Sequence, residues 1–469
     1  MDGEPVLLAE LLRLAQWGPR QLVNAVNKAL SAQGRERLRL DPTAGYAWVK
    51  HGSCPRTPIP EFAAAVLTDR LGFTVTAEQV WPGAAPGATK TTAVAGFGSV
   101  SHVDDLVREL GRLTFVSSAP GNPVEGASGA DLTFTVVDQL RGVDLTARMR
   151  SGHEHVLPEQ VDLIGTHVAA LRGLDDRHGG GALSLRYVAA ELRNVMELLQ
   201  HANYDVRTGR RLMAIVADLA QLLGWMHFDS GRHGAAERYL LLSVGVCRAI
   251  SEADRAANAI GMLSYVSSFA GHGTHAVRLA EAASAETRSR DPVLRARLLG
   301  REATAAAADG DLGRFRRCAG RAAELLDRGR PGHGPAFLYY LTPTQLAAET
   351  GQALVVLAER TGVHGPGLLS EGIELLSTSV AGMAATGPTP AYARSGLLHT
   401  TFLAEAHLRQ GCLGEAIAAM RTGVGLLPIV QSPRGRGYLR LLRPVLARRA
   451  RSVIVREFLP ELDAALSTP

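Results

Sequence analysis

The chain has 469 residues, of which 46% are hydrophobic and 20% are charged. This balance is typical of folded globular proteins and excludes wholesale disorder, and the length corresponds to two to four domains. The net charge of +5 is too small to establish a polyanionic partner by itself.

The sequence shows no sign of membrane insertion, secretion or disulfide bonding. No apolar run approaches the roughly 20 residues that cross a bilayer, and the N-terminus lacks the basic segment of a secretion signal. The four cysteines contain no CxxC pair, which speaks against a disulfide framework or a zinc knuckle. We therefore expect a cytoplasmic protein with no membrane partner, metal or cofactor.

Residues 5–82 are predicted to form a compact helical domain. Leucines form an apolar stripe over 7–14, and Pro19 suits the first turn of a second helix. Asp41, Pro42 and Thr43 give a helix-start signal before a third helix. The later helices are predicted at 19–30, 43–50, 60–71 and 76–80. Eight basic and two acidic residues lie between Arg13 and Arg56.

The middle and the C-terminal part of the chain differ in composition. Residues 83–160 are rich in Gly, Ser, Thr and Pro and are predicted to be a flexible linker with short ordered pieces, such as a helix at 103–113. The stretch 132–137 alternates like a strand. Residues 161–465 have helical periodicity almost throughout, interrupted by short turns. The whole pattern predicts an all-α fold.

A repeated pattern lies within 161–465. At three positions a glycine is followed after five residues by an alanine, and after four more by an apolar or small residue. Gly310 and Gly351 fit more loosely, with Phe315 and Val356 in place of the alanine. The first four turn glycines are spaced by about 40 residues. This resembles the tetratricopeptide helix–turn–helix repeat, whose period is about 34, with lengthened helices. We predict a tetratricopeptide-like α-solenoid, because one helical hairpin cannot bury its apolar face alone; an irregular helical bundle is the alternative. The glycines are Gly231, Gly271, Gly310, Gly351 and Gly411.

The third N-terminal helix carries a family signature. Trp48 and Gly52 resemble residues of the Xre/Cro-like helix-turn-helix family, in which a tryptophan anchors the recognition helix and a glycine ends it. Val49 and Gly45 depart from the pattern of that family. Val49 replaces the usual acidic residue, and Gly45 inside the helix should cost about 1 kcal/mol relative to alanine.

This resemblance implies that the third helix enters the major groove of double-stranded DNA. Its exposed residues would then contact base edges or flanking phosphates, while nearby polar and basic residues would hold the backbone. For each arginine the alternative is an ordinary solvated surface residue. The residues implied for the groove are Thr43, Ala44, Tyr46 and Lys50, and those for the backbone are Gln21, Arg35, Arg37, Arg39 and Arg56.

A longer resemblance covers most of the chain outside the linker. The segments 174–181, 209–212 and 224–239 are similar to a large actinobacterial family that joins an Xre-like domain to tetratricopeptide repeats. The family includes negative regulators of sporulation and antibiotic production. It implies a DNA-binding transcriptional regulator, nucleoid-associated when bound to DNA. A homodimer is expected from helix-turn-helix symmetry.

The repeats offer a second candidate site. In a tetratricopeptide stack the first helix of each hairpin lines the concave side, where amides and charges can bind a peptide, small-molecule or protein effector. The alternative is that these residues are hydrated or satisfy one another. The predicted groove residues are Asp218, Gln221, Trp225, Asn258, Tyr265, Arg297, Gln345, Glu405 and Arg409.

Enzymatic motifs are incomplete. His178 and the three glycines after it resemble an oxyanion-hole segment, but the chain contains no GxSxG nucleophile elbow. The groups 153–155 and 175–178 lack the HExxH spacing of a zinc site. We expect no catalytic residue. The alternative function is a non-DNA-binding tetratricopeptide scaffold with a degenerate helix-turn-helix module, favoured by Gly45, Val49 and the nine basic and eight acidic residues of 1–82.

Overall fold

The computed structural model describes most of the chain. The described residues are 17–81 apart from 33–34, 52, 57 and 72–76, then 154–467 apart from 330–333, 363–364 and 385–390, and parts of 8–15, 106–126 and 129–141. Their regular structure is helical, with one isolated bridge between His155 and Asn203. The all-α prediction is confirmed. Among these residues no helix combines the length and the apolar character that a bilayer crossing demands.

The chain divides into two compact units. The first joins Met1–Thr91 to Arg436–Pro469, and the second is Thr92–Gly435. Helix α20 therefore begins in the second unit and continues into the first. The predicted repeat domain extended to residue 465, whereas this division ends the second unit at Gly435.

The first unit contains the helices predicted from the sequence, displaced by one or two residues at their ends. Leu22, Val26 and Leu30 bury one face of the second helix, and Trp48 lies against them in the same core. Leu441 of α20 packs against that core. The elements are α2 (Pro19–Ala32), η1 (Glu36–Leu38), α3 (Ala44–His51), α4 (Ile59–Leu71), α5 (Ala77–Val80), α20 (Pro433–Ala447) and α21 (Val453–Ser467).

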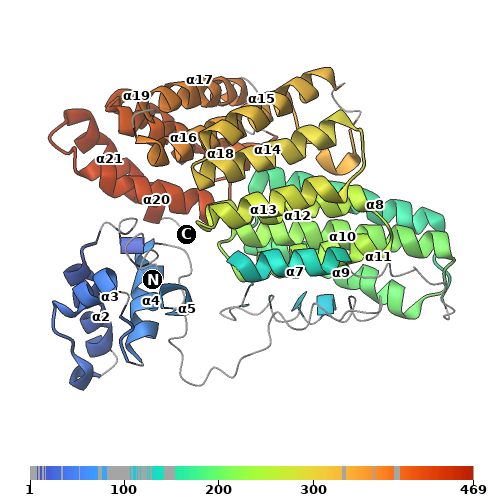
Figure 1. Cartoon of the computed structure of the whole chain (residues 1–469), viewed down its shortest axis with the longest axis horizontal. Helices are drawn as coiled ribbons and strands as arrows, with labels where there is room; N and C mark the ends of the chain where they lie inside the picture. Colours follow the sequence, from blue (N-terminus) through green and yellow to red (C-terminus); the bar gives the residue numbers. More distant parts are fainter. Residues whose placement is uncertain are drawn as a thin grey trace. The chain divides into compact units, whose positions relative to one another are not determined.

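The second unit is a repeat-like series of adjacent helix pairs (Figure 1). Successive helices pack on one another, and buried apolar side chains from α7 to the start of α16 form one continuous core. The helices are α7 (Gly129–Arg141), α8 (Pro158–His178), α9 (Ala182–His201), α10 (Val206–Asp229), α11 (His233–Ala249), α12 (Ala253–Phe269), α13 (Gly273–Glu286), α14 (Pro292–Asp309), α15 (Leu312–Arg328), η2 (Ala336–Leu338), α16 (Pro343–Arg360), α17 (Gly365–Ala384), α18 (Ala393–Gln410) and α19 (Leu413–Leu426).

Four of the five predicted turn glycines lie in turns. Gly231, Gly271, Gly310 and Gly411 have φ values of +75°, +85°, +85° and +83°, the left-handed conformation that glycine adopts without steric strain. Gly351 does not: the prediction of a turn there is wrong. It lies inside α16, where a Cβ atom would come within 2.9 Å of the Leu376 side chain on α17. Its lack of a side chain lets two helices approach, and the chain turns later.

Most described residues of the predicted linker are helical, and those from residue 92 onward belong to the second unit. Leu106, Leu110 and Leu113 are buried in its core, within the predicted helix 103–113, whose first residue lies outside the described ones. The strand-like stretch 132–137 is part of α7, so the alternation was misleading. Alternating polar residues did not prevent a helix, because Leu132 and Val136 share one helical face and bury it.

Candidate functional site

Helix α3 has one buried face and one exposed face. The side chain of Trp48 is 5% exposed and packs edge-on against Trp81, with 5.7 Å between the ring centroids. On the opposite face Tyr46 is 50% exposed, and Thr43 and Lys50 are exposed as well. Trp48 therefore anchors the helix, while Tyr46 and Lys50 project from it. Ala44 is partly buried against the core and offers less surface than its neighbours.

Local contacts hold the start of α3 against α2. The Asp41 carboxylate accepts a hydrogen bond from the Thr43 backbone N–H at 2.7 Å, and the Thr43 side chain and backbone together lower the pKa of Asp41. Asn27 on α2 bonds both the N–H and the C=O of Leu40. A Cβ atom at Gly45 would lie 2.4 Å from the carbonyl oxygen of Pro19. Glycine is therefore required here by a helix crossing, so Gly45 gives no support to a degenerate motif.

The predicted backbone-contacting residues are exposed on the unit that contains α3. Arg35, Arg37, Arg39 and Arg56 are all exposed, and the first three flank or form the short η1 turn. Arg20 lies 5.9 Å from the centroid of the Tyr46 ring, so at least one positive charge lies beside the exposed face of α3. Gln21 is exposed too, and its side-chain oxygen accepts a bond from the Gly18 N–H at 2.6 Å.

Three predicted groove residues meet in one small pocket of the second unit. Asp218, Gln221 and Asn258 line it together with Arg255 and Phe337. Its volume of about 10 Å³ is close to the room that a single water molecule needs. Asp218 is paired with Arg172 at 3.1 Å and with Arg255. This pocket is therefore too small for a peptide.

The other predicted groove residues are mostly engaged within the helix packing. Arg297 is 1% exposed and donates to both oxygens of Glu349, at 3.1 and 2.6 Å, and Gln345 donates to the same carboxylate. Burial raises the pKa of Glu349, but the charges of Arg297 and Arg301 outweigh it and lower the value to about 2. Arg297 thus lies inside the packing and not on an open groove.

The predicted groove residues of α18, Glu405 and Arg409, also make contacts within the helix packing. Arg409 donates to the backbone carbonyl of Val355 on α16 at 2.7 Å, and its guanidinium lies 3.7 Å from Glu405. Trp225 and Tyr265 instead belong to an aromatic cluster on α10 and α12, with their ring centroids 5.6 Å apart. Tyr265 is buried, whereas Trp225 is only partly buried.

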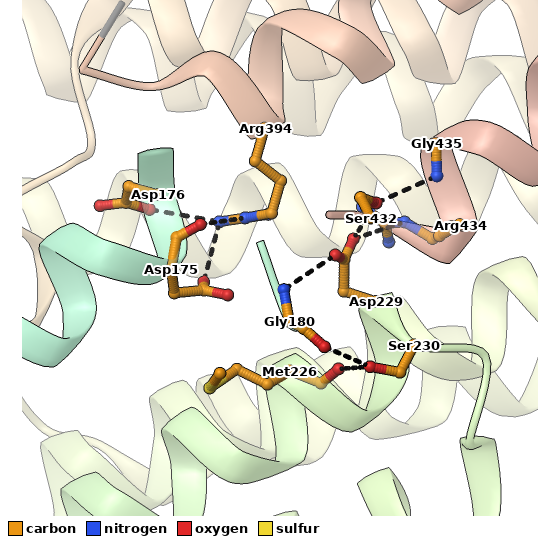
Figure 2. Close-up of polar contacts among 10 residues, drawn as sticks. All are labelled: Asp175, Asp176, Gly180, Met226, Asp229, Ser230, Arg394, Ser432, Arg434 and Gly435. Carbon is orange, nitrogen blue, oxygen red and sulfur yellow. Dashed lines mark hydrogen bonds and ion pairs between the residues drawn. The ribbon is translucent and has the colours of Figure 1, made fainter. Parts of the chain in front are cut away.

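A buried cluster of charged residues next to Trp225 was not predicted from the sequence; Figure 2 shows its polar contacts. Arg394 on α18 reaches the end of α8, where its guanidinium lies 3.3 Å from Asp175 and 3.2 Å from Asp176. Arg434, at the start of α20, lies 3.7 Å from Asp229, which is fully buried at the end of α10. Burial raises the pKa of Asp175 to about 7, although Arg394 opposes this.

Glycines and hydroxyls complete this cluster, as Figure 2 shows. The Gly180 N–H and the Ser432 hydroxyl both donate to Asp229, at 3.3 and 2.8 Å. A Cβ atom at Gly180 would lie 2.5 Å from the carbonyl oxygen of Met226. The His178 carbonyl accepts a bond from the Gln431 N–H at 2.6 Å. We call the contacts of 175–180 with Asp229, Arg394 and 431–434 the clasp. The run of charges before three glycines was its only sequence signal.

Three guanidinium groups surround the indole of Trp225. Their central carbons lie 5.4 Å (Arg394), 5.5 Å (Arg434) and 5.8 Å (Arg301) from the ring centroid. Arg434 and Arg301 also lie over Phe228 and Tyr265, at 4.5 and 4.3 Å. Cation–π contacts of this kind are favourable, more so away from water. We call the three arginines and Trp225 the arginine–tryptophan hub.

The two sequence groups considered for metal have no such arrangement in the described part of the chain. There, no group of three or more His, Cys, Asp or Glu side chains could hold an ion. His155 lies in the isolated bridge with Asn203, and His153 lies outside the described residues.

Comparison with known proteins bears on the N-terminal domain. Residues 8–80 match the family described as the SP15 N-terminal domain. The match spans the described helices α2 to α5 and a small part of the whole chain. No curated protein matches the chain.

Proposed function

We propose that the protein is a DNA-binding transcriptional regulator that places α3 in the major groove. The observation that carries the proposal is the two-faced α3, in which buried Trp48 fixes the helix while Tyr46 and Lys50 project from it. A helix presented in this way fits a groove about 12 Å wide, where side chains can reach base edges.

The charges around α3 support the same proposal. Arg35, Arg37, Arg39 and Arg56 are exposed on the unit that carries it. Phosphate contacts of this kind supply affinity and set the register of a protein on the duplex. The near-neutral total of residues 1–82 does not oppose this, because the local excess of positive charge is what a phosphate backbone meets.

The second unit completes the proposed regulator. A single small head binds DNA weakly, so a homodimer joined through the helix pairs would raise affinity by effective concentration. The resemblance to Xre-like regulators with tetratricopeptide repeats extends the proposal to repression of development or antibiotic production genes in the cytoplasm. An effector held by the second unit would change the spacing of the two heads.

Genomic binding selection with the full chain, followed by affinity measurements on the selected fragment, tests this proposal. We expect a preferred sequence and a log Kd that varies linearly with log salt concentration. The double variant Tyr46→Ala, Lys50→Ala should bind at least tenfold more weakly, because a lost base contact or phosphate contact each removes about 1–3 kcal/mol. Its salt slope should fall by about one.

Lys28→Ala is the matched control. Lys28 is an exposed lysine on α2, so its loss changes the net charge equally without altering α3. We expect a much smaller change in affinity for it. Absence of sequence preference, or equal losses in both variants, would reject DNA reading by α3. In that case unchanged protein partners in pull-down experiments would favour the interaction scaffold.

A further inference from the structure

The arginine–tryptophan hub holds buried cations that its partners satisfy unevenly. Four guanidinium groups lie in or beside it, those of Arg297, Arg301, Arg394 and Arg434, and their side chains are at least nine-tenths buried. The carboxylates that face them are Glu349, Asp229, Asp176 and Asp175.

Arg434 lacks hydrogen-bond acceptors for two nitrogen atoms, and Arg301 has only one long contact with a carboxylate. The Nε and Nη1 atoms of Arg434 are buried without a hydrogen-bond partner, although the side chain is only 9% exposed. Arg301 reaches Glu349 only at 3.5 Å, and both oxygens of that carboxylate are already bonded by Arg297. By contrast, Arg394 has backbone and carboxylate acceptors in the clasp.

Buried cations without acceptors are strongly unfavourable. A buried charged donor that lacks a partner loses more than the one to three kcal/mol of a neutral group, and native structures rarely retain such groups without a reason. Burial and the neighbouring positive charge of Arg297 also lower the pKa of Arg301. An anion beside Trp225 would give Arg434 the acceptor that its Nε and Nη1 atoms lack, and would strengthen the long contact that Arg301 makes with Glu349.

We propose that the arginine–tryptophan hub binds a small oxyanion, a phosphate or carboxylate group, between Arg301 and Arg434 beside Trp225. Trp225 is only partly buried, so part of its side chain reaches solvent. Guanidinium groups match the geometry of two-oxygen anions and form short, charge-assisted hydrogen bonds with them. The inference gives the chemical class of the proposed effector and rests on that part of the proposed function alone.

An anion bound at the hub would lie next to the contacts that hold the start of α20. Arg434 follows Ser432, whose hydroxyl bonds both Asp229 and the Gly435 N–H at the start of α20. An anion that draws Arg434 toward Arg301 would therefore change its distance from Asp229. Asp229 would keep its bonds from Gly180 and Ser432, so the clasp would remain satisfied.

Calorimetric titration of the full chain with inorganic phosphate and, separately, with acetate tests the proposal, with sodium chloride at matched ionic strength as the reference. We expect saturable binding of at least one of the two anions. Trp225 is the one tryptophan between residues 92 and 435, so its fluorescence should change on binding and the change should be absent in Trp225→Phe. Binding of phosphate alone or acetate alone supports the site and identifies the chemical source of the oxyanion.

The variants Arg434→Gln and Arg301→Gln should each bind about tenfold more weakly or worse, because each removes a charged donor. Arg316→Gln is the matched control: Arg316 pairs with Glu371 on the surface, and its loss should leave binding unchanged. Circular dichroism and thermal unfolding report whether each variant folds. If Arg434→Gln does not fold, Arg434→Lys keeps the charge beside Asp229 and loses the planar fork, and it too should bind more weakly.

Absence of saturable binding of both anions to the wild-type chain would overturn the proposal. Equal affinity of the wild type, Arg434→Gln and Arg301→Gln would overturn it as well. These titrations contain no DNA, and the DNA assay contains neither test anion, so failure of one proposal is seen separately from failure of the other.

Discussion

At the scale of single residues, the close crossing of α2 and α3 depends on the absence of a side chain at Gly45. Gly45 lies where a Cβ would be 2.4 Å from the Pro19 carbonyl oxygen and 3.0 Å from a Val23 methyl group. Helix propensity alone favours alanine by about 1 kcal/mol. The contact reverses that preference, because the atom in the way is backbone and cannot rotate aside. Packing decides this position, and propensity does not.

Gly45→Ala should therefore lower the free energy of unfolding, by about 1–3 kcal/mol, as overpacked cores do. Urea unfolding followed by the fluorescence of Trp48 and Trp81 measures it. Gly437→Ala is the control in the same compact unit: it lies within α20, and nothing is within 4 Å of its Cβ position. It should be neutral or stabilising by up to about 1 kcal/mol. A stable Gly45→Ala variant would refute the crossing described here.

At the scale of elements, α11 binds pieces of the chain that composition assigned to a linker. The Tyr239 hydroxyl contacts Ser117 at 2.9 Å and Thr114 at 3.2 Å, and Arg232 donates to the Ser117 carbonyl. Gly126, in the same predicted linker, also approaches α11, because a Cβ atom there would meet the carboxylate of Glu237. Burial raises the pKa of Glu237 to about 8, while Arg238 opposes this. The contact surface of α11 therefore contains a buried, titrating carboxyl.

This carboxyl makes stability depend on pH in a defined direction. The folded pKa of about 8 exceeds the ordinary value of 4.5, so between these pH values the folded chain holds a proton that the unfolded chain releases. Stability contributed by Glu237 therefore decreases as pH rises from 4.5 to 8. Glu237→Gln mimics the neutral form and should exceed the wild type at pH 8 by on the order of a few kcal/mol.

Urea unfolding of the two proteins at a series of pH values measures this difference. The curves should converge near pH 4.5 and separate as pH rises. Glu374→Gln, an exposed position on α17, is the control and should keep the wild-type pH dependence. Parallel curves for the wild type and Glu237→Gln would show that the carboxyl is not buried as described.

At the scale of the whole second unit, the clasp joins parts of the chain that are far apart in sequence. Arg394 and Asp176 are separated by 218 residues, and Ser432 and Asp229 by 203. The clasp thus connects α8 and α10 to α18 and to the segment before α20. An open row of helix pairs would make contacts only between neighbours. The clasp adds a long-range contact, whose charged groups are almost entirely removed from water.

Arg394→Ala should therefore destabilise the second unit strongly, by about 3–5 kcal/mol, because Asp175 and Asp176 remain buried without their partner. Thermal or urea unfolding of the full chain measures the loss. Arg316→Ala removes an arginine from an exposed pair with Glu371, and its effect should lie between about 0 and 1 kcal/mol. Similar values for the two variants would mean that the clasp is not the buried contact described above.

Most of the local structure could be predicted from short segments of the sequence, apart from the strand-like stretch 132–137 and the turn expected at Gly351. Helical periodicity, the start signals at Pro19 and Asp41 and the left-handed turns at Gly231, Gly271, Gly310 and Gly411 are properties of short segments, and the structure confirms them. The anchoring position of Trp48 was implied instead by the resemblance to the Xre/Cro-like helix-turn-helix family, and Trp48 is buried in the structure.

Only the tertiary structure decided which polar residues meet. Gly351 has the spacing of a turn glycine, yet it serves a contact between α16 and α17. Arg297 has the spacing of a groove residue, yet Glu349 holds it inside the packing. Arg394 and Arg434 had no local signal at all. The physical reason is that periodicity reports which face of a helix is buried, whereas the partner of a buried charge comes from another chain segment, 52 residues away for Arg297 and 218 for Arg394.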